Sequence, residues 1–257
     1  MLIKQDTIQL SEIFTSIEGE GVFVGTKTLF VRMAGCHLKC RWCDTNYALP
    51  MLSGNRYSVD YAKQLIAEHL QPFTYKVNFT GGEPLVQYEG VIELAKFVRD
   101  RGLRTYLESA CYDSARFAKL VPYIDICKVE FKMSDSEVVG INRYDDLLQN
   151  EIMCLKTSVD ARKISYIKVV VTKSTNSGEF AGLVDNIFRE IEPSDICGFI
   201  IQPSSGLDEP SIYDLMRFYD IVYPFYTEVR IIPQSHKQIG AKDRSTKSHN
   251  LVTTLVY

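Results

Sequence analysis

"AGCHLKCRWCDT", residues 34–45, follows the apolar run "TLFVRMA" and places three cysteines in a C-x3-C-x2-C spacing. Cys36, Cys40 and Cys43 therefore come from eight residues of one loop, and no fourth cysteine follows at a matching interval. Structural zinc and iron–sulfur sites normally take four protein ligands. Two centres fit three thiolates: a zinc ion that takes His37 as a further ligand, and a [4Fe–4S] cluster whose fourth iron is left open.

The spacing alone leaves both centres possible, but two features favour the cluster. Closed structural zinc sites usually pair their ligands across two turns, and this chain supplies no second C-x2-C. His37 directly follows Cys36, so its side chain need not point to the same centre. In a three-cysteine cluster the missing ligand position is where a small molecule can chelate the open iron.

A second segment, "FTGGEPL" at residues 79–85, also carries ligand-binding chemistry. Glycines allow the backbone to approach a ligand closely, and the carboxylate of Glu83 complements an ammonium group. Taken alone, the same residues could form only a tight turn between a strand and a helix.

Composition limits the classes of partner. The chain has 257 residues and a formal charge of -3, which gives no electrostatic reason to bind nucleic acid or membrane. No signal peptide or membrane-length apolar run is present, so we expect a cytoplasmic protein with a small-molecule partner. The odd total of seven cysteines indicates reduced thiols, and the four outside the loop are expected to be small buried side chains: Cys111, Cys127, Cys154 and Cys197.

Alternating apolar runs and helical patterns predict an α/β fold built on a parallel sheet. The expected strands are 28–34, 76–81, 104–109, 126–132, 166–172, 198–203 and 228–234, and the expected helices are 59–70, 88–102, 112–122, 179–192 and 209–222. Six to seven strands are too few for a closed eight-stranded barrel, so we expect an open, partial parallel βα barrel. We predict a single domain over residues 1–257, with a C-terminal tail from about residue 241. Ligands should gather at the carboxyl ends of the strands, where the cysteine loop and the glycine segment lie.

The cysteine loop, with Trp42 just before its last cysteine, resembles the signature of the radical S-adenosylmethionine (SAM) superfamily, and "FTGGEPL" resembles its GGE motif. The resemblance implies a partial barrel of the radical SAM type in which the open iron binds the amino and carboxylate groups of SAM. An electron from the cluster then cleaves SAM to methionine and a 5′-deoxyadenosyl radical.

The upstream stretch "EIFTSIEGEGVFVGTKTLFVRMAGC" and the following "CRWCDT" are similar to the 7-carboxy-7-deazaguanine synthase family. The similarity runs to about residue 90 and reappears in "IIQPSSG" and "RIIPQSHKQIG". It implies a carbon–nitrogen lyase, dependent on SAM and Mg²⁺, that contracts 6-carboxy-5,6,7,8-tetrahydropterin to 7-carboxy-7-deazaguanine with loss of ammonia. This product leads to the 7-deazapurines queuosine and archaeosine. A flavodoxin or ferredoxin as electron donor and a homodimer are implied as well.

The same resemblance implies roles for individual residues. The cluster takes Cys36, Cys40 and Cys43, and Mg²⁺ takes the hydroxyl of Thr45, supported through water by Asp44. The pterin is expected at Ile17, Glu18, Gly19, Arg32 and Thr80, and the residues nearest its chemistry are Glu20, Arg32 and His236. SAM is expected at Gly81, Gly82, Glu83, Ser109, Glu130, Phe131, Lys132, Gln202, Pro203, Ser204 and Ser205.

Arg32 is also informative without the family resemblance. A lone cation in an apolar strand needs an anionic partner if its side chain faces inward. That partner is either the carboxylate of the substrate or a local Glu.

Three positions depart from the common family pattern: Glu18 replaces a Gln, residues 108–110 read Glu-Ser-Ala, and residues 130–132 read Glu-Phe-Lys. Two other functions are considered, a radical SAM activating enzyme that acts on a protein and a zinc-binding module.

Overall fold

One nine-stranded sheet organises the computed structural model, which describes residues 6–138 and 143–238. The strand order is β3-β1-β2-β4-β5-β6-β7-β8-β9, with β3 and β9 at the two edges, so the sheet stays open. The C-terminal tail expected from residue 241 lies outside the described residues.

All seven strands expected from the sequence are present, and they form one continuous parallel ladder. Their bounds are β2 (Lys27–Met33), β4 (Lys76–Gly81), β5 (Arg104–Ser109), β6 (Ile126–Phe131), β7 (Ile164–Val171), β8 (Phe199–Pro203) and β9 (Val229–Ile231). Parallel strands are buried on both faces and read as apolar runs, which is why the sequence predicts them well.

Two strands were not predicted. The strands β1 (Thr7–Ile17) and β3 (Asn55–Ser58) join the sheet antiparallel, with β1 between β2 and β3. β1 is only partly buried along its length and β3 is largely exposed, so neither has the apolar run that marks the other strands. β1 ends at Ile17, and its position beside β2 brings the EGEG segment to the inner face of the sheet.

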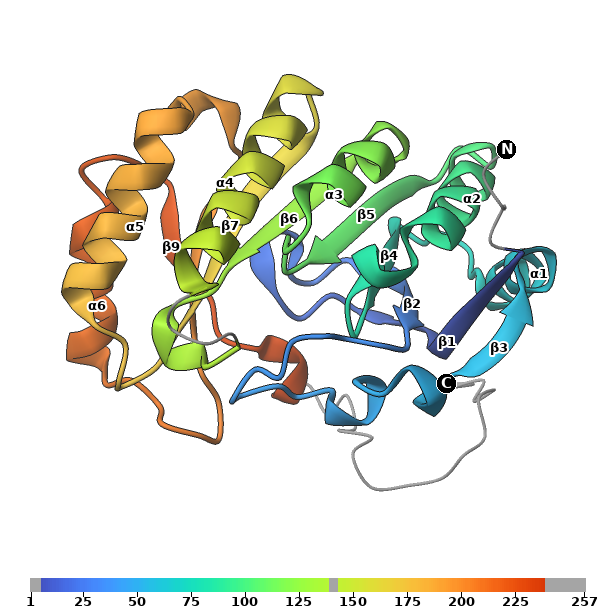
Figure 1. Ribbon diagram of the computed structural model, residues 1–257, viewed down its shortest axis with the longest axis horizontal. Coiled ribbons are helices and arrows are strands. Elements are labelled where there is room, and N and C mark those ends of the chain that lie inside the picture. The colour runs from blue at the N-terminus through green and yellow to red at the C-terminus, as the bar shows by residue number, and fades with distance from the viewer. Residues whose placement is uncertain (1–5, 139–142, 239–257) are drawn as a thin grey trace.

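Six helices stand side by side along one face of the sheet (Figure 1). They are α1 (Val59–His69), α2 (Tyr88–Arg99), α3 (Ser114–Leu120), α4 (Tyr144–Asp160), α5 (Ser177–Glu190) and α6 (Ile212–Val222). α4 was not predicted, because its buried face includes the polar side chains of Glu151 and Ser158, which interrupt the apolar periodicity.

The pleat of the strands gives the two faces of the sheet different chemistry. On β6, Cys127, Val129 and Phe131 pack into the large core under the helices. The alternate residues Lys128 and Glu130 point to the opposite, inner face. The deeper part of that face is closed by a small apolar cluster of Tyr106, Ile126, Tyr166 and Ile200, against which Val22 and Phe23 pack. Charged groups therefore gather on the inner face, above an apolar floor.

The core between sheet and helices provides a test of the fold. Phe180 is fully buried, and its ring centroid lies 4.8 Å from that of Phe218 and 6.4 Å from that of Phe199. We expect Phe180→Ala to lower the free energy of unfolding by about 3–5 kcal/mol, measured by urea denaturation, because a large cavity replaces the ring. Phe73→Ala, at a side chain that is 97% exposed, should change it by less than about 0.5 kcal/mol. Equal losses in the two variants would contradict this packing.

Candidate active site

The cysteine loop leaves β2 and is fixed by main-chain hydrogen bonds. The N–H of Gly35 donates to Ala48 O at 2.9 Å, and the N–H of Cys36 donates to Leu49 O at 2.9 Å. Farther along the loop, the N–H of Arg41 donates to Ser136 O at 3.2 Å. The three thiols of the loop are free and partly buried, so the backbone presents them as a set without closing them off from a ligand.

The surroundings of the thiols fit a cluster better than a zinc ion. His37 packs its ring against Tyr112 with a centroid separation of 3.6 Å. Zinc ligands converge on one point, yet the three thiols and His37 form no compact ligand group among the residues described. Burial, with the nearby Glu83 carboxylate, raises the pKa of Cys36 to about 12. A bound metal centre would favour the thiolate form that ligation needs.

The GGE segment packs directly against the cysteine loop. The N–H of Glu83 donates to Gly35 O at 2.8 Å, and the N–H of Gly82 donates to Met33 O at 3.0 Å. A Cβ atom on Gly82 would lie 2.3 Å from Gly35 O, closer than any side chain permits. The absence of a side chain at Gly82 is therefore what lets the end of β4 touch the loop that carries the cysteines.

Glu83 anchors its own surroundings. Its Oε1 accepts hydrogen bonds from Leu85 N and Ser109 Oγ, both at 2.9 Å, and its Oε2 accepts one from Ala110 N at 2.8 Å. The turn interpretation of this motif is thus present in the structure, since Glu83 caps the short helix that follows. A contact of Glu83 with the ammonium group of SAM stays a prediction.

The EGEG segment after β1 and the segment around His236 meet beside the cysteine loop. The ring of His236 lies against the Cα of Gly19, where a Cβ would come within 2.4 Å of Nδ1. Gln234 joins the EGEG segment to the loop, because its Nε2 donates to Glu20 Oε1 at 2.8 Å and to Asp44 Oδ2 at 2.9 Å. Ligand atoms of Glu20, Asp44 and His236 all lie within 4.8 Å of one another. This is a group of oxygen and nitrogen donors that could hold a metal ion.

Thr45 lies next to this group in the chain. It occupies the N-cap position of a short 3-10 helix, but its side chain makes no capping hydrogen bond. A helix-capping role of the side chain is therefore not supported at Thr45. Its hydroxyl lies 3.7 Å from the sulfur of Cys43.

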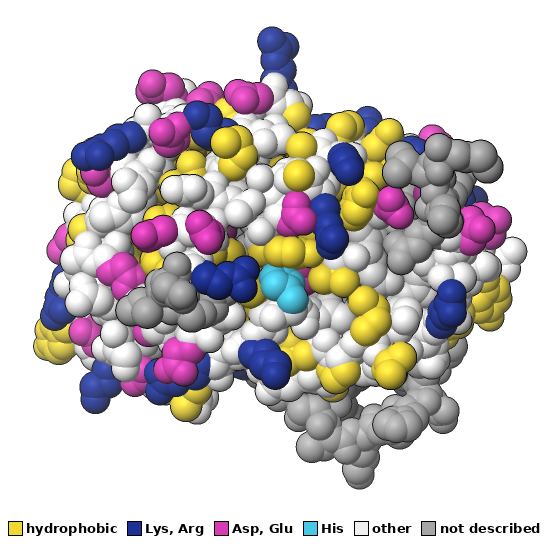
Figure 2. Space-filling model, viewed as in Figure 1, with side chains coloured by type: hydrophobic (Ala, Val, Ile, Leu, Met, Phe, Trp, Pro, Cys, Tyr) yellow, Lys and Arg dark blue, Asp and Glu magenta, His cyan; other side chains and the backbone are white. Residues whose placement is uncertain are grey.

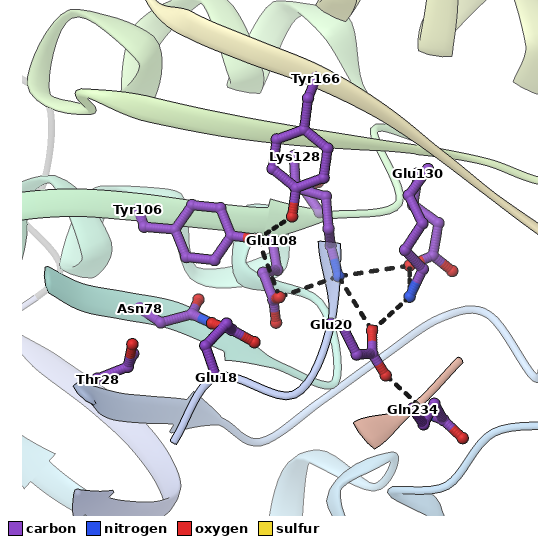
Figure 3. Close-up of polar contacts among 12 residues, drawn as sticks. Glu18, Glu20, Thr28, Asn78, Tyr106, Glu108, Lys128, Glu130, Tyr166 and Gln234 are labelled. Atoms are coloured by element: carbon purple, nitrogen blue, oxygen red, sulfur yellow. Dashed lines mark hydrogen bonds and ion pairs between the residues drawn. The ribbon is translucent and has the colours of Figure 1, made fainter. Parts of the chain in front are cut away.

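A network of buried charges lines the inner face next to Glu20 (Figure 3). Lys168 Nζ lies 2.6 Å from Glu20 Oε2 and 3.1 Å from Glu130 Oε2. Lys128 Nζ lies 3.0 Å from Glu108 Oε1 and 3.6 Å from Glu130 Oε2. It also lies 3.7 Å from Glu20 Oε2. Although burial opposes ionisation, these two lysines hold the pKa of Glu20 well below its usual range, so Glu20 is an anion.

A second buried ion pair lies deeper, where Lys76 Nζ contacts Glu18 Oε2 at 2.6 Å and Thr28 Oγ1 at 2.8 Å. Burial, and then the charge of Glu108, raises the pKa of Glu18 to about 7, while burial lowers that of Lys76. Glu18 and Lys76 thus form a closely hydrogen-bonded buried pair. Asn78 donates weakly to Glu18 at 3.4 Å, and its buried Oδ1 has no partner among the described residues.

Arg32 has a local partner. Its Nε lies 3.1 Å from Glu12 Oε2, on the neighbouring strand β1, and the hydroxyl of Tyr47 donates to the same oxygen at 3.0 Å. The local-Glu alternative considered from the sequence is therefore the contact present here. Arg32 also lies beside Thr80 in the register of β2 and β4, so pairing with a substrate carboxylate stays a prediction.

The remaining predicted ligand residues lie at the carboxyl ends of the parallel strands, except Ile17, which ends the antiparallel β1 beside Lys27 at the start of β2. Lys132 forms an ion pair with Glu130, whereas the side chain of Phe131 is buried in the core under the helices, so only its main chain can face a ligand. Gln202 is buried, and its Oε1 lacks a partner in the described part of the chain. The other positions lie nearby along the chain: Ile17 at the end of β1, Gly81 at the end of β4, and Pro203, Ser204 and Ser205 at and after the end of β8.

Sequence reasoning missed five residues of this site: Lys76, Glu108, Lys128, Lys168 and Gln234. Four of them carried a readable signal, because charged residues at alternate positions of apolar strands mark an inner polar face. "ICKVEFK" and "YIKVVVT" show this pattern. Gln234 carried none, since its role depends on a contact with Glu20, far away in the sequence.

Comparison with known proteins identifies the family to which this chain belongs. A model of the 4Fe-4S single cluster domain matches residues 17–138. The 7-carboxy-7-deazaguanine synthase of Archaeoglobus fulgidus is 32% identical over 244 residues, which cover 91% of this chain and 98% of the relative. The chain belongs to the 7-carboxy-7-deazaguanine synthase family. The enzyme of that name from Methanocaldococcus jannaschii is 28% identical over 245 residues, which cover 90% of this chain and 99% of the relative.

Solved structures show the same fold. QueE from Escherichia coli superposes with a TM-score of 0.62 at 18% identity, covering 90% of this chain and 95% of that one. SuiB of Streptococcus suis, bound to its precursor peptide SuiA, gives a TM-score of 0.55 at 18% identity, covering 76% of this chain and 46% of that one. The expected open parallel βα fold of the radical SAM type is thus confirmed, with two antiparallel strands added at one edge.

The contact between Gly82 and Gly35 yields a prediction. We expect Gly82→Ala to displace the cysteine loop, because its Cβ would fall 2.3 Å from a backbone oxygen. Iron content and visible absorbance after anaerobic reconstitution should fall well below those of the wild type. Gly182→Ala, where a Cβ meets nothing within 4 Å, should reconstitute fully. Normal iron content in Gly82→Ala would show that this approach does not position the cysteines.

Proposed function

We propose that this protein converts 6-carboxy-5,6,7,8-tetrahydropterin to 7-carboxy-7-deazaguanine with loss of ammonia, as a SAM- and Mg²⁺-dependent carbon–nitrogen lyase. The observation that carries the proposal is the meeting of three distant family motifs. Gly19 and Glu20 of the EGEG segment contact His236 and Gln234 near the C-terminal end of the described chain, and Gln234 reaches Asp44 of the cysteine loop.

The donor sets fit a cluster and SAM. Cys36, Cys40 and Cys43 would hold three irons, and the GGE segment lies against their loop. The partnerless, buried Oε1 of Gln202 offers an acceptor at a position expected for SAM. When bound, these cofactors supply a radical by reductive cleavage of SAM. In this proposal the substrate lies beside them on the inner face, and the apolar cluster around Tyr106 and Tyr166, which closes that face below, would help to exclude water.

The inner face also matches the chemistry of the substrate. A carboxypterin combines an anionic carboxylate with a ring edge rich in N–H donors. Arg32, whose side chain on β2 is 15% exposed, offers a guanidinium for the carboxylate. Glu18 and Glu20 offer carboxylate acceptors for the N–H groups. Because Glu20 stays ionised, it accepts hydrogen bonds without competing for a proton.

Mg²⁺ fits next to Thr45. A hard cation of this kind keeps several waters and takes few protein oxygens. The hydroxyl of Thr45 would be its direct ligand, and the adjacent Asp44 would support it through water. This arrangement stands beside the oxygen-rich group that Asp44 forms with Glu20.

The cellular setting extends the proposal. We expect a flavodoxin or ferredoxin as electron donor, a homodimer in the cytoplasm, and a product used for queuosine or archaeosine. Among the described residues, no helix is long and apolar enough to cross a membrane.

The reaction itself is the first test. Anaerobically reconstituted protein with SAM, dithionite, Mg²⁺ and the carboxypterin should form 7-carboxy-7-deazaguanine, detected by mass spectrometry. Cys36→Ala, Cys40→Ala and Cys43→Ala should each abolish the product and the iron absorbance, because each removes a cluster ligand. Cys197→Ala should retain both, because Cys197 lies outside the cysteine loop and is exposed, so the burial expected for it from the sequence was wrong.

Two outcomes of that experiment would support the rival functions. Stoichiometric zinc in place of iron would indicate a zinc-binding module. A reconstituted cluster that cleaves SAM but leaves the carboxypterin unchanged would indicate a radical SAM enzyme of another substrate class, such as an activating enzyme.

Thr45→Ala tests the metal. We expect the variant to keep its cluster and its slow SAM cleavage, but to lose most of the stimulation of product formation by Mg²⁺, because its direct protein ligand is gone. Product formation is measured over a titration with MgCl₂. Thr157→Ala, at a surface hydroxyl that bonds within α4, serves as the matched control. An unchanged Mg²⁺ response in Thr45→Ala would make the hydroxyl structural.

A further inference from the structure

Lys168 is the link between two carboxylates that come from different parts of the chain. Glu20 belongs to the EGEG segment after β1, and Glu130 belongs to β6. The Nζ atom of Lys168 contacts both, at 2.6 Å and 3.1 Å. In the sheet register Lys168 on β7 lies directly beside Glu130, so the strands hold one half of this contact in place. The other half connects a loop residue to the sheet.

The lysines and the glutamates of this network differ in how deeply their side chains are buried. The side chains of Lys128 and Lys168 are only 5% and 4% exposed, whereas those of Glu20, Glu108 and Glu130 are 14–15% exposed. The three carboxylates are thus the more exposed groups of this network, and the two ammonium groups are the more deeply buried ones. Figure 3 shows Glu20, Glu108 and Glu130 around Lys128. A ligand on this face would meet the carboxylates first.

The charges require the lysines to be present. Three carboxylates lie around Lys128 and Lys168, and buried like charges repel strongly unless cations separate them. Lysines and acids are mixed differently on the outer surface, where Figure 2 shows them interspersed and facing water. Among the described residues of the inner face, Glu20, Glu108 and Glu130 share the buried cations Lys128 and Lys168, and Glu130 also contacts Lys132.

We propose that Lys168, with Lys128, is a positioning residue that ties the substrate-side carboxylate of Glu20 to the SAM-side carboxylate of Glu130. The inference rests on the proposed function and assigns a role to side chains beneath its binding residues. Lys168 acts through Glu20: it orients the carboxylate that accepts hydrogen bonds from the pterin, and it does not touch the pterin itself. Lys128 neutralises the remaining charge of Glu108 and Glu130.

Carboxypterin binding to the oxidised, cluster-loaded protein, measured by calorimetry, tests this role without turnover. Lys168→Met should raise the dissociation constant about 10- to 100-fold, the range expected when a charged hydrogen bond is lost. Lys168→Arg should recover most of the affinity, because a guanidinium can bridge two carboxylates. Lys156→Met, which removes a 2.6 Å surface ion pair with Glu190, should bind as the wild type does.

A double-mutant cycle separates positioning from a structural effect. If Lys168 acts through Glu20, then Lys168→Met should add little to the loss already caused by Glu20→Gln. The double variant also leaves fewer unpaired buried charges, so it provides the comparison even if Lys168→Met alone folds poorly. In turnover assays, Lys168→Met should raise KM more than it lowers kcat.

The outcomes distinguish the inference from the function on which it rests. Additive losses in the cycle, or wild-type affinity in Lys168→Met, would overturn the role of Lys168 while the wild type still converts the carboxypterin. A wild-type protein that carries its cluster but neither binds nor converts the carboxypterin would overturn the proposed function and this inference together.

Discussion

The balance of buried charge on the inner face is the constraint on which the site depends. Lys76, Lys128 and Lys168 are nearly inaccessible to water, and each is compensated by a carboxylate within 3.0 Å. Removing one partner would leave a buried charge, which costs far more than the pair contributes. The EGEG segment is therefore held on the sheet by electrostatics as much as by packing, since Glu18 and Glu20 supply two of these partners.

A steric constraint complements the electrostatic one at the carboxyl end of the sheet. Gly82 allows β4 to end against the cysteine loop, and Glu83 then ties the end of β5 to the same point through Ser109 and Ala110. The loop, the GGE turn and the end of β5 thus move as one unit. A cofactor held there would be fixed relative to the carboxylates of the inner face, because both are anchored to the same parallel strands.

The sequence predicted the seven parallel strands because burial on both faces leaves a continuous apolar run. It did not predict β1 and β3, which are only partly covered, or α4, whose buried face includes Glu151. In the site, the motifs located the cysteines, the GGE turn and His236. The motifs did not predict the lysines, because they consist of residues that face a ligand, whereas Lys128 and Lys168 lie beneath those residues.

The Glu at position 18 shows why the ion-pair partner of a buried charge must be identified from the three-dimensional structure. The Gln that the family resemblance implies at this position would be neutral, so a Glu here adds a negative charge to a face that already carries Glu108. Lys76, 58 residues away in the sequence, supplies the compensating cation at 2.6 Å. Glu18 is therefore accommodated because it forms an ion pair with Lys76. The net charge of this pair is close to zero, as it would be for a neutral Gln side chain. On this reasoning, the departure changes the wall of the site without requiring a different substrate.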